Sequence, residues 1–209
     1  MRAMKPEINP LCSRQSTQRC HLLTGVLVLL TVLMLESCGG SLYKVKPISA
    51  LPAMPANAAT ATAGVLTFRA SPLLTDEESQ ELFESNLQMA GLLPVRMQIA
   101  HSGGEPVELK KVKVHLRDAA GNQWQGISAK KAISRILKWN GVFAYNPESR
   151  KTFEKEFRAY ELDLKTPLTQ GQREGFLIFL SPRKEPVASP RGLVLTIDGL
   201  SQPIVLNLN

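Results

Sequence analysis

Apolar side chains recur at about every second position in several short stretches after residue 64, and this alternation predicts a mainly β fold. Such a period is typical of strands that bury one face and expose the other. The stretches are residues 65–68, 95–99, 160–164, 193–197 and 204–208, with a longer one over 107–116. Residues 175–180 are instead continuously apolar, which predicts a central strand buried on both faces. Together these stretches predict seven or eight strands.

The stretch over 107–116 contains a change of phase. Val107 and Leu109 lie on one parity, whereas Val112, Val114 and Leu116 lie on the other, with two lysines between the sets. We therefore expect a β-bulge inside this strand.

Three segments show helical rather than strand periodicity. Thr75 and Glu78 have the spacing of a capping box, which predicts a helix that runs to about Ala90 and stops at Gly91. A helix over 129–138 is the clearest, and another is expected over 147–158. The apolar stripe of the clearest helix comprises Ala129, Ala132, Ile133, Ile136 and Leu137. Strands with two or three helical insertions predict an antiparallel β-sandwich, immunoglobulin-like in the broad sense.

One apolar run near the amino terminus indicates where the chain resides. Residues 22–35 span 14 positions, which as a helix cover about 21 Å of a hydrocarbon core about 30 Å thick. The run is too short to span a membrane comfortably. Four basic residues and one acidic residue precede it. Residues 1–37 are therefore predicted to be a signal peptide.

Leu35-Glu36-Ser37-Cys38 follows the run directly and resembles the lipobox of bacterial lipoproteins. Glu36 departs from the small or weakly polar residue usual there. The resemblance implies cleavage before Cys38, a diacylglycerol on its sulfur and an acylated amino group, such as a palmitoyl amide. Because Gly39 stands where an aspartate would favour the inner membrane, the resemblance also implies the outer membrane, facing the periplasm. The alternative is an ordinary secretory signal with a chance cysteine.

Cysteine usage agrees with a lipid anchor. Cys12 and Cys20 lie in the segment that would be removed, and lipid would occupy the thiol of Cys38. The mature chain would then have neither a disulfide nor a free thiol in an oxidising compartment.

Residues 38–63 are predicted to be a flexible linker between the lipid and a domain over 64–209. They contain three prolines and a run rich in alanine and threonine, without apolar periodicity. At up to about 3.3 Å per residue, such a linker would let the domain stand several nanometres from the membrane.

Two stretches of the expected domain carry a wider resemblance. The first runs from Leu82 through Gly91-Leu-Leu-Pro94 to Gly121, and the second runs from Leu168 to residue 179. They resemble uncharacterised bacterial lipoproteins with an immunoglobulin-like domain. Because the shared motifs are structural, the resemblance implies an envelope location and a fold, and no reaction.

The sequence shows no pattern of catalytic residues. After residue 38 it has two histidines, His101 and His115, and neither has the ligand spacing of a zinc site. A nucleophile elbow, a phosphate-binding loop and the metalloprotease motif are absent from the sequence. We therefore predict no enzyme, no metal site and no cofactor.

Positive charge is concentrated in the helical insertion over 126–158. This segment has eight basic and three acidic residues, so its net charge is +5. It predicts either a solvated helix face over the sandwich or a patch for an anionic partner. Trp139, Phe143 and Tyr145 lie next to the basic residues of this segment in sequence. The candidate patch comprises Lys130, Lys131, Arg135, Lys138, Arg150, Lys151, Lys155 and Arg158, with the first four expected to point outward.

These features favour a non-catalytic lipoprotein of the cell envelope, attached to the membrane through lipid on Cys38. Its domain is expected to bind another envelope component, and the expected partner is a protein. The alternative is binding of anionic lipid or glycan through residues 126–158. A third reading is an envelope hydrolase with an unrecognised site. Nucleic acid is not expected as a partner of an exported chain, despite a pI of about 9.5.

Overall fold

The computed structural model describes residues 43–142, 146–188 and 190–209. The predicted signal peptide, Cys38, Phe143 and Tyr145 lie outside the described residues. The helices are a short 3-10 helix, η3 (Ile48–Ala50), α2 (Asp76–Phe83), α3 (Ala129–Trp139) and α4 (Pro147–Arg158). The strands are β1 (Ala59–Ala63), β2 (Leu66–Pro72), β3 (Leu92–His101), β4 (Lys113–Arg117), β5 (Gln123–Ile127), β6 (Gly171–Leu180), β7 (Val194–Asp198) and β8 (Ile204–Asn207).

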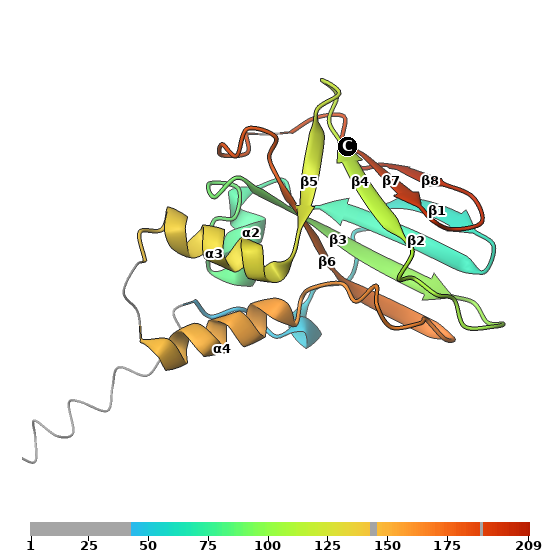
Figure 1. Cartoon of the computed structure of the whole chain (residues 1–209), viewed down its shortest axis with the longest axis horizontal. Coiled ribbons are helices and arrows are strands. Elements are labelled where there is room, and N and C mark those ends of the chain that lie inside the picture. The colour runs from blue at the N-terminus through green and yellow to red at the C-terminus, as the bar shows by residue number, and fades with distance from the viewer. Residues whose placement is uncertain (1–42, 143–145, 189) are drawn as a thin grey trace, which may run out of the picture. The chain divides into compact units, whose positions relative to one another are not determined.

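The eight strands form one antiparallel sheet in the order β1-β2-β3-β6-β5-β4-β7-β8. The sheet curls until the edge strands β1 and β8 lie next to each other, so it is nearly closed into a barrel (Figure 1). The predicted mainly β, antiparallel fold with helices is therefore confirmed. The immunoglobulin-like sandwich is not confirmed, because the ladders join all eight strands into a single sheet.

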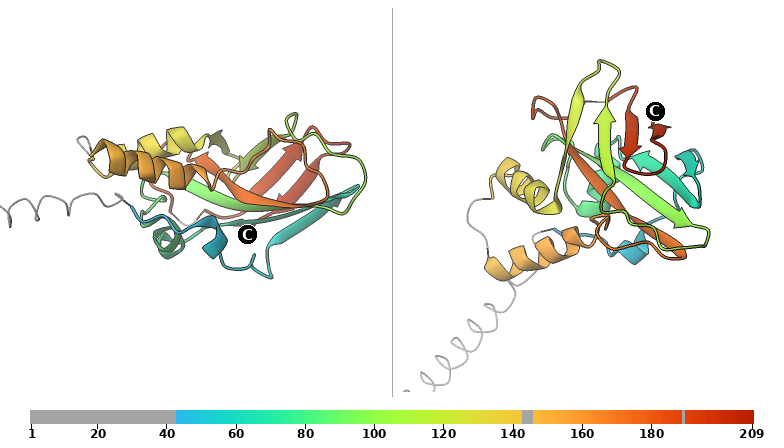
Figure 2. Two further views of the ribbon diagram at one scale, coloured as in Figure 1. Left: turned by 90° about the horizontal axis from the view of Figure 1, so that it is seen from below. Right: turned by 45° about the vertical axis from the view of Figure 1, so that its right-hand side comes forward.

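The molecule has two apolar cores, and β6 separates them. Phe179 belongs to the core inside the barrel, whereas Phe176, Ile178 and Leu180 belong to a second core between the outer face of the sheet and the helices. The helices gather over that outer face at one end of the barrel (Figures 1 and 2). Burial on both faces explains why 175–180 is continuously apolar. Phe176 and Ile178 are buried as predicted.

Helix α3 matches its prediction in bounds and in orientation. All five residues of its apolar stripe are buried in the second core. Helix α4 also has its predicted bounds.

Helix α2 starts as predicted but ends early. Its capping box is present, with Thr75 accepting from the backbone of Glu78. Glu84 then takes a left-handed conformation with φ 50°, so the predicted continuation to Ala90 is wrong. The side chain of the buried Gln88 donates to the backbone carbonyls of Leu73 and Thr75, which holds residues 84–91 as a turn instead.

The predicted bulge, the start of one predicted strand and the whole of another are also wrong. Val107 makes one isolated bridge to Leu168, and β4 begins only at Lys113, so no continuous strand covers 107–116. Val112 and Val114, predicted to be buried, are only partly buried. Residues 160–164 form a single bridge to Phe176 rather than a strand.

Strand β5 was not predicted. Its sequence is polar apart from Trp124 and Ile127, because one face lies at the barrel surface. Its tryptophan is buried inside the barrel, as a strand with one covered face requires.

The linker prediction fails for residues 43–63. Strand β1 pairs with β2 along its whole length. Upstream, Val45 is buried, and Tyr43 and Leu51 pack against the second core. In β1 the alanines face inward and the threonines outward, a period of two that small side chains conceal in a hydropathy pattern.

Candidate functional site: an open wall of the barrel

The barrel wall opens where β5 leaves β4. The ladder between β4 and β5 covers only Leu116 and Arg117, and β5 then pairs with β6 through Gln125–Ile127. The first three residues of β4, Lys113–His115, pair with β7 on one side. On their other side no strand of the described chain pairs with them, so this stretch of β4 is a free edge.

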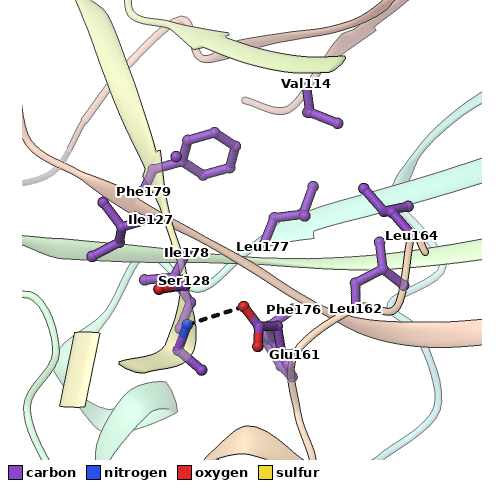
Figure 3. A pocket seen from close by; sticks show the side chains of 12 residues that line it. Val114, Ile127, Ser128, Glu161, Leu162, Leu164, Phe176, Leu177, Ile178 and Phe179 are labelled. Carbon is purple, nitrogen blue, oxygen red and sulfur yellow. Dashed lines mark hydrogen bonds between the residues drawn. The ribbon is translucent and has the colours of Figure 1, made fainter. Parts of the chain in front are cut away.

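A cleft of about 320 Å³ lies beside this free edge. It is enclosed by β4, the end of β5, the start of α3, residues 161–164 and β6, and its lining is mainly apolar. Figure 3 shows Leu164 and Leu177 pointing toward Val114 across the cleft. The lining residues are Val114, Gly126, Ile127, Ser128, Ala129, Glu161, Leu162, Leu164, Phe176, Leu177, Ile178 and Phe179.

Glu161 is the one ionisable residue among those lining the cleft, and it has a structural role. Its Oε1 accepts a hydrogen bond of 3.1 Å from the backbone N–H of Ala129 (Figure 3). Ser128, the N-cap residue of α3, makes no side-chain cap bond, so Glu161 caps the helix in its place. A carboxylate at this end also suits the helix dipole. The lining therefore favours binding of an apolar group over acid–base chemistry.

Several apolar residues of this cleft belong to stretches that the sequence predicts as ordinary strands. Val114 and Leu164 each continue an alternating pattern, and nothing local shows that the strands around them separate. Gly126 is an isolated glycine in a strand, a feature that often marks a bulge or a close backbone approach. A Cβ added there would lie 3.8 Å from the ring of Phe179, in ordinary contact distance.

A second cavity, of about 210 Å³, lies between residues 52–55 and the start of α2. The buried Arg96 reaches its wall but is already paired, because its Nε lies 2.5 Å from Oε1 of Glu174 on the neighbouring strand. Glu78 and Glu81 also line this cavity, and each has a partner: Glu78 closes the capping box and Glu81 pairs with Lys46. These groups hold the fold together.

The eight residues of the predicted basic patch divide into three groups. Four have an exposed side chain and no ion pair among the described residues: Lys130, Lys131, Lys138 and Lys155. Three on α4 pair with acids of their own helix: Arg150 and Arg158 with Glu154, and Lys151 with Glu148. The pairing with Glu148 raises the pKa of Lys151 above its ordinary value. Arg135 forms the third group.

Arg135 does not point outward as predicted. Its Nε donates a hydrogen bond to the carbonyl of Ala90, and its Nη2 donates to that of Lys184. It therefore ties α3 to two loops, and the exposed basic surface of α3 consists of lysines alone.

The two histidines of the predicted domain each have a nearby partner in the structure. His101 is buried and bonds to Gly103 and Glu105 of its own turn. His115 is exposed on β4, 3.8 Å from Asp198. Within the described ranges no three histidines, cysteines or acids gather as metal ligands would.

Among the residues that the structure describes, no helix has the length and apolarity needed to span a bilayer. Comparisons with protein-family models, with curated proteins and with solved structures find no match to this chain. A proposal on its function therefore depends on its own residues.

Proposed function

We propose that this protein is a lipid-anchored component of a bacterial cell envelope, attached through Cys38, and that it acts by binding. Its barrel takes an extended segment of another envelope protein into the cleft between β4 and residues 161–164. The outer membrane, facing the periplasm, is the location that fits Gly39 after the anchor.

The free edge of β4 beside an apolar floor is the observation that carries this proposal. Lys113–His115 offer backbone donors and acceptors that no strand of the described chain uses on that side. An extended peptide matches both features, because its backbone adds to the edge while alternate side chains enter the cleft. An acyl chain would fill the apolar floor but leave the polar edge to water. Peptide addition is therefore the better match.

The lipid anchor is supported by the sequence alone. The apolar run over 22–35 has the length of a signal peptide, and Leu35 and Ser37 precede Cys38 with lipobox spacing. One acyl chain holds a protein to a membrane only marginally, whereas two or more hold it stably.

Site-specific photocrosslinking tests the cleft. A photoreactive amino acid replaces His115 at the free edge of β4, in the full chain, in cells of its own organism. The same amino acid at Val205, which is exposed on β8, serves as the position control. We expect an adduct with one protein at position 115 and not at position 205. A lipid adduct at 115 would contradict a peptide ligand.

A matched pair of variants makes this test sharper. Gly126→Leu places a side chain in the cleft, where a Cβ has room. Gln125→Leu adds the same side chain at the adjacent exposed position, which faces the other side of β5. The adduct should disappear with Gly126→Leu and persist with Gln125→Leu. An adduct that survives Gly126→Leu would refute the proposal.

The anchor is tested separately by mass spectrometry of the mature protein. We expect Cys38 at its amino terminus with lipid attached, and Cys38→Ala should leave unprocessed or released protein. An unmodified Cys38 inside a longer mature chain would overturn the anchor.

A further inference from the structure

We infer that the protein lies directly on its membrane, with Tyr43, the exposed face of α3 and the first turn of α4 against an anionic lipid surface. The inference rests on the lipid anchor proposed above and is independent of the cleft.

The length of chain between anchor and domain is the first argument. Tyr43 is already held on the domain, since its ring lies 5.0 Å from that of Phe153 on α4 and its hydroxyl oxygen accepts a hydrogen bond from the Nδ2 of Asn140, just after α3. Only four residues, 39–42, separate Cys38 from Tyr43, so five residue-to-residue steps place Tyr43 at most about 17 Å from the anchored cysteine. This end of the domain must therefore lie near the lipid headgroups.

The contacts that follow Tyr43 prevent the tether from becoming longer. Val45 is buried, the N–H of Lys46 donates to the carbonyl of Leu82, and the carbonyl of Lys46 accepts from Tyr160. In Figure 1 the segment that starts at Tyr43 runs beside α4. Releasing it would break these bonds and expose Val45.

The positive charge along α3 is the second argument. Helix α3 has four basic residues and no acidic one, and three of the four, Lys130, Lys131 and Lys138, are exposed and unpaired within the described chain. Lys131 and Lys138 are seven residues apart, which places them on one face of the helix. Each lysine near an anionic leaflet adds about fivefold to affinity.

Trp139 is the third argument. It is 48% exposed at the end of α3, next to Lys138, although most large apolar side chains of the described chain are covered. Tryptophan is enriched at the boundary between water and lipid, where its ring and its N–H both find suitable surroundings. The partner that lies within reach of the anchor and matches both lysines and tryptophan is the membrane itself.

The two tryptophans provide the test. Trp124 is buried in the barrel, where its Nε1 donates to Asp118, and so it serves as an internal control for Trp139. The lipidated full chain is placed in vesicles of phosphatidylglycerol or of phosphatidylcholine, with bromine on acyl carbons near the headgroup. Trp124→Phe and Trp139→Phe leave one reporter each.

We expect Trp139 emission in brominated phosphatidylglycerol to fall at least about twofold, and Trp124 emission to stay unchanged. The loss should be smaller in phosphatidylcholine and should diminish as salt screens the lysines. Replacing Lys130, Lys131 and Lys138, the three exposed lysines of α3, by Glu should abolish it. Replacing Lys110, Lys111 and Lys165, also exposed but away from the helices, should not.

Vesicle flotation distinguishes failure of the proposed lipid anchor from failure of the proposed orientation on the membrane. Chain that floats, and does so only with Cys38 intact, but whose Trp139 is not quenched would overturn the docked orientation while the anchor stands. Chain that does not float would overturn the anchor and the orientation together. Quenching that is equal in both lipids, or unaffected by the three Lys→Glu changes, would refute an anionic surface as the partner.

Discussion

The hydroxyl of Tyr160 donates a hydrogen bond of 2.5 Å to the backbone carbonyl of Lys46, 114 residues earlier in the chain. The ring of Tyr160 lies 5.2 Å from that of Phe83 and 5.6 Å from that of Phe176, inside the second core. One side chain thus joins the first described segment to α2 and to the central strand β6. The position of residues 43–51 on the domain depends on this contact.

Tyr160→Phe should loosen that segment without disturbing the core. The ring stays in place and one hydrogen bond is lost, so the free energy of unfolding should fall by about 1 kcal/mol. Urea unfolding measures this. Limited proteolysis over residues 47–56 should become faster. If proteolysis is unchanged, Tyr160 does not hold the segment.

Asp118 should stabilise the fold in a pH-dependent manner. Burial opposes its ionisation, but hydrogen bonds from Asn122, Trp124 and Ala120 to its carboxylate outweigh that effect and lower its pKa below the usual 3.8. Because the pKa is lower in the folded state, the stabilisation is present above about pH 4 and is lost as pH falls through the folded-state pKa.

The variant Asp118→Asn measures that contribution. It should unfold about 1–2 kcal/mol more easily at pH 7, since an amide nitrogen replaces an acceptor facing two donors. The difference from the unmodified protein should shrink below pH 4. A difference that stays constant from pH 7 to pH 3 would contradict the assignment.

Two strand glycines should respond to alanine by very different amounts. A Cβ on Gly175 of β6 would lie 2.7 Å from the Cα and 2.8 Å from the N of Leu162, so backbone must move. A Cβ on Gly126 of β5 meets only Phe179, at 3.8 Å. Gly175→Ala should therefore destabilise by about 1–3 kcal/mol, and Gly126→Ala by much less. Comparable melting temperatures for the two variants would contradict the packing of residues 160–164 on β6.

Substitutions at Ile133 test whether α3 packs on the sheet in solution. It is 1% exposed in the second core, so Ile133→Asp buries an unpaired carboxylate and should lower stability by several kcal/mol. Ile133→Val, the conservative control, should cost about 1 kcal/mol. A normal melting temperature for Ile133→Asp would mean that α3 packs elsewhere.

Local patterns predicted the elements whose apolar residues form a complete pattern. Helix α3 has an apolar stripe on one face, and β6 has an apolar run over 175–180 with both faces buried. Both occur where expected, although β6 begins earlier, at Gly171. The capping box of α2 was also predictable from the sequence, because it involves only residues three apart. The end of α2 was not, since it depends on Gln88 reaching the backbone of Leu73, fifteen residues away.

The candidate sites were the least predictable part. The cleft exists because β5 changes partners between β4 and β6, and pairing between strands leaves no mark in either strand alone. The direction of Arg135 likewise depends on carbonyls that the loops at Ala90 and Lys184 bring to it. The lysines of α3, by contrast, are exposed as expected, because only the opposite face is apolar.

Strands β1 and β8 lie side by side, and this arrangement determines how a truncated protein without β1 should behave. Each is an edge strand, and each lies beside the other, so neither offers a long open edge to a second molecule. Starting the chain at Gly64, the boundary that the apolar pattern suggested, deletes β1 and uncovers the edges of β2 and β8 together. Such a fragment would retain most of its core and yet be prone to edge-to-edge aggregation, so the alanine–threonine run contributes to solubility as well as to the sheet.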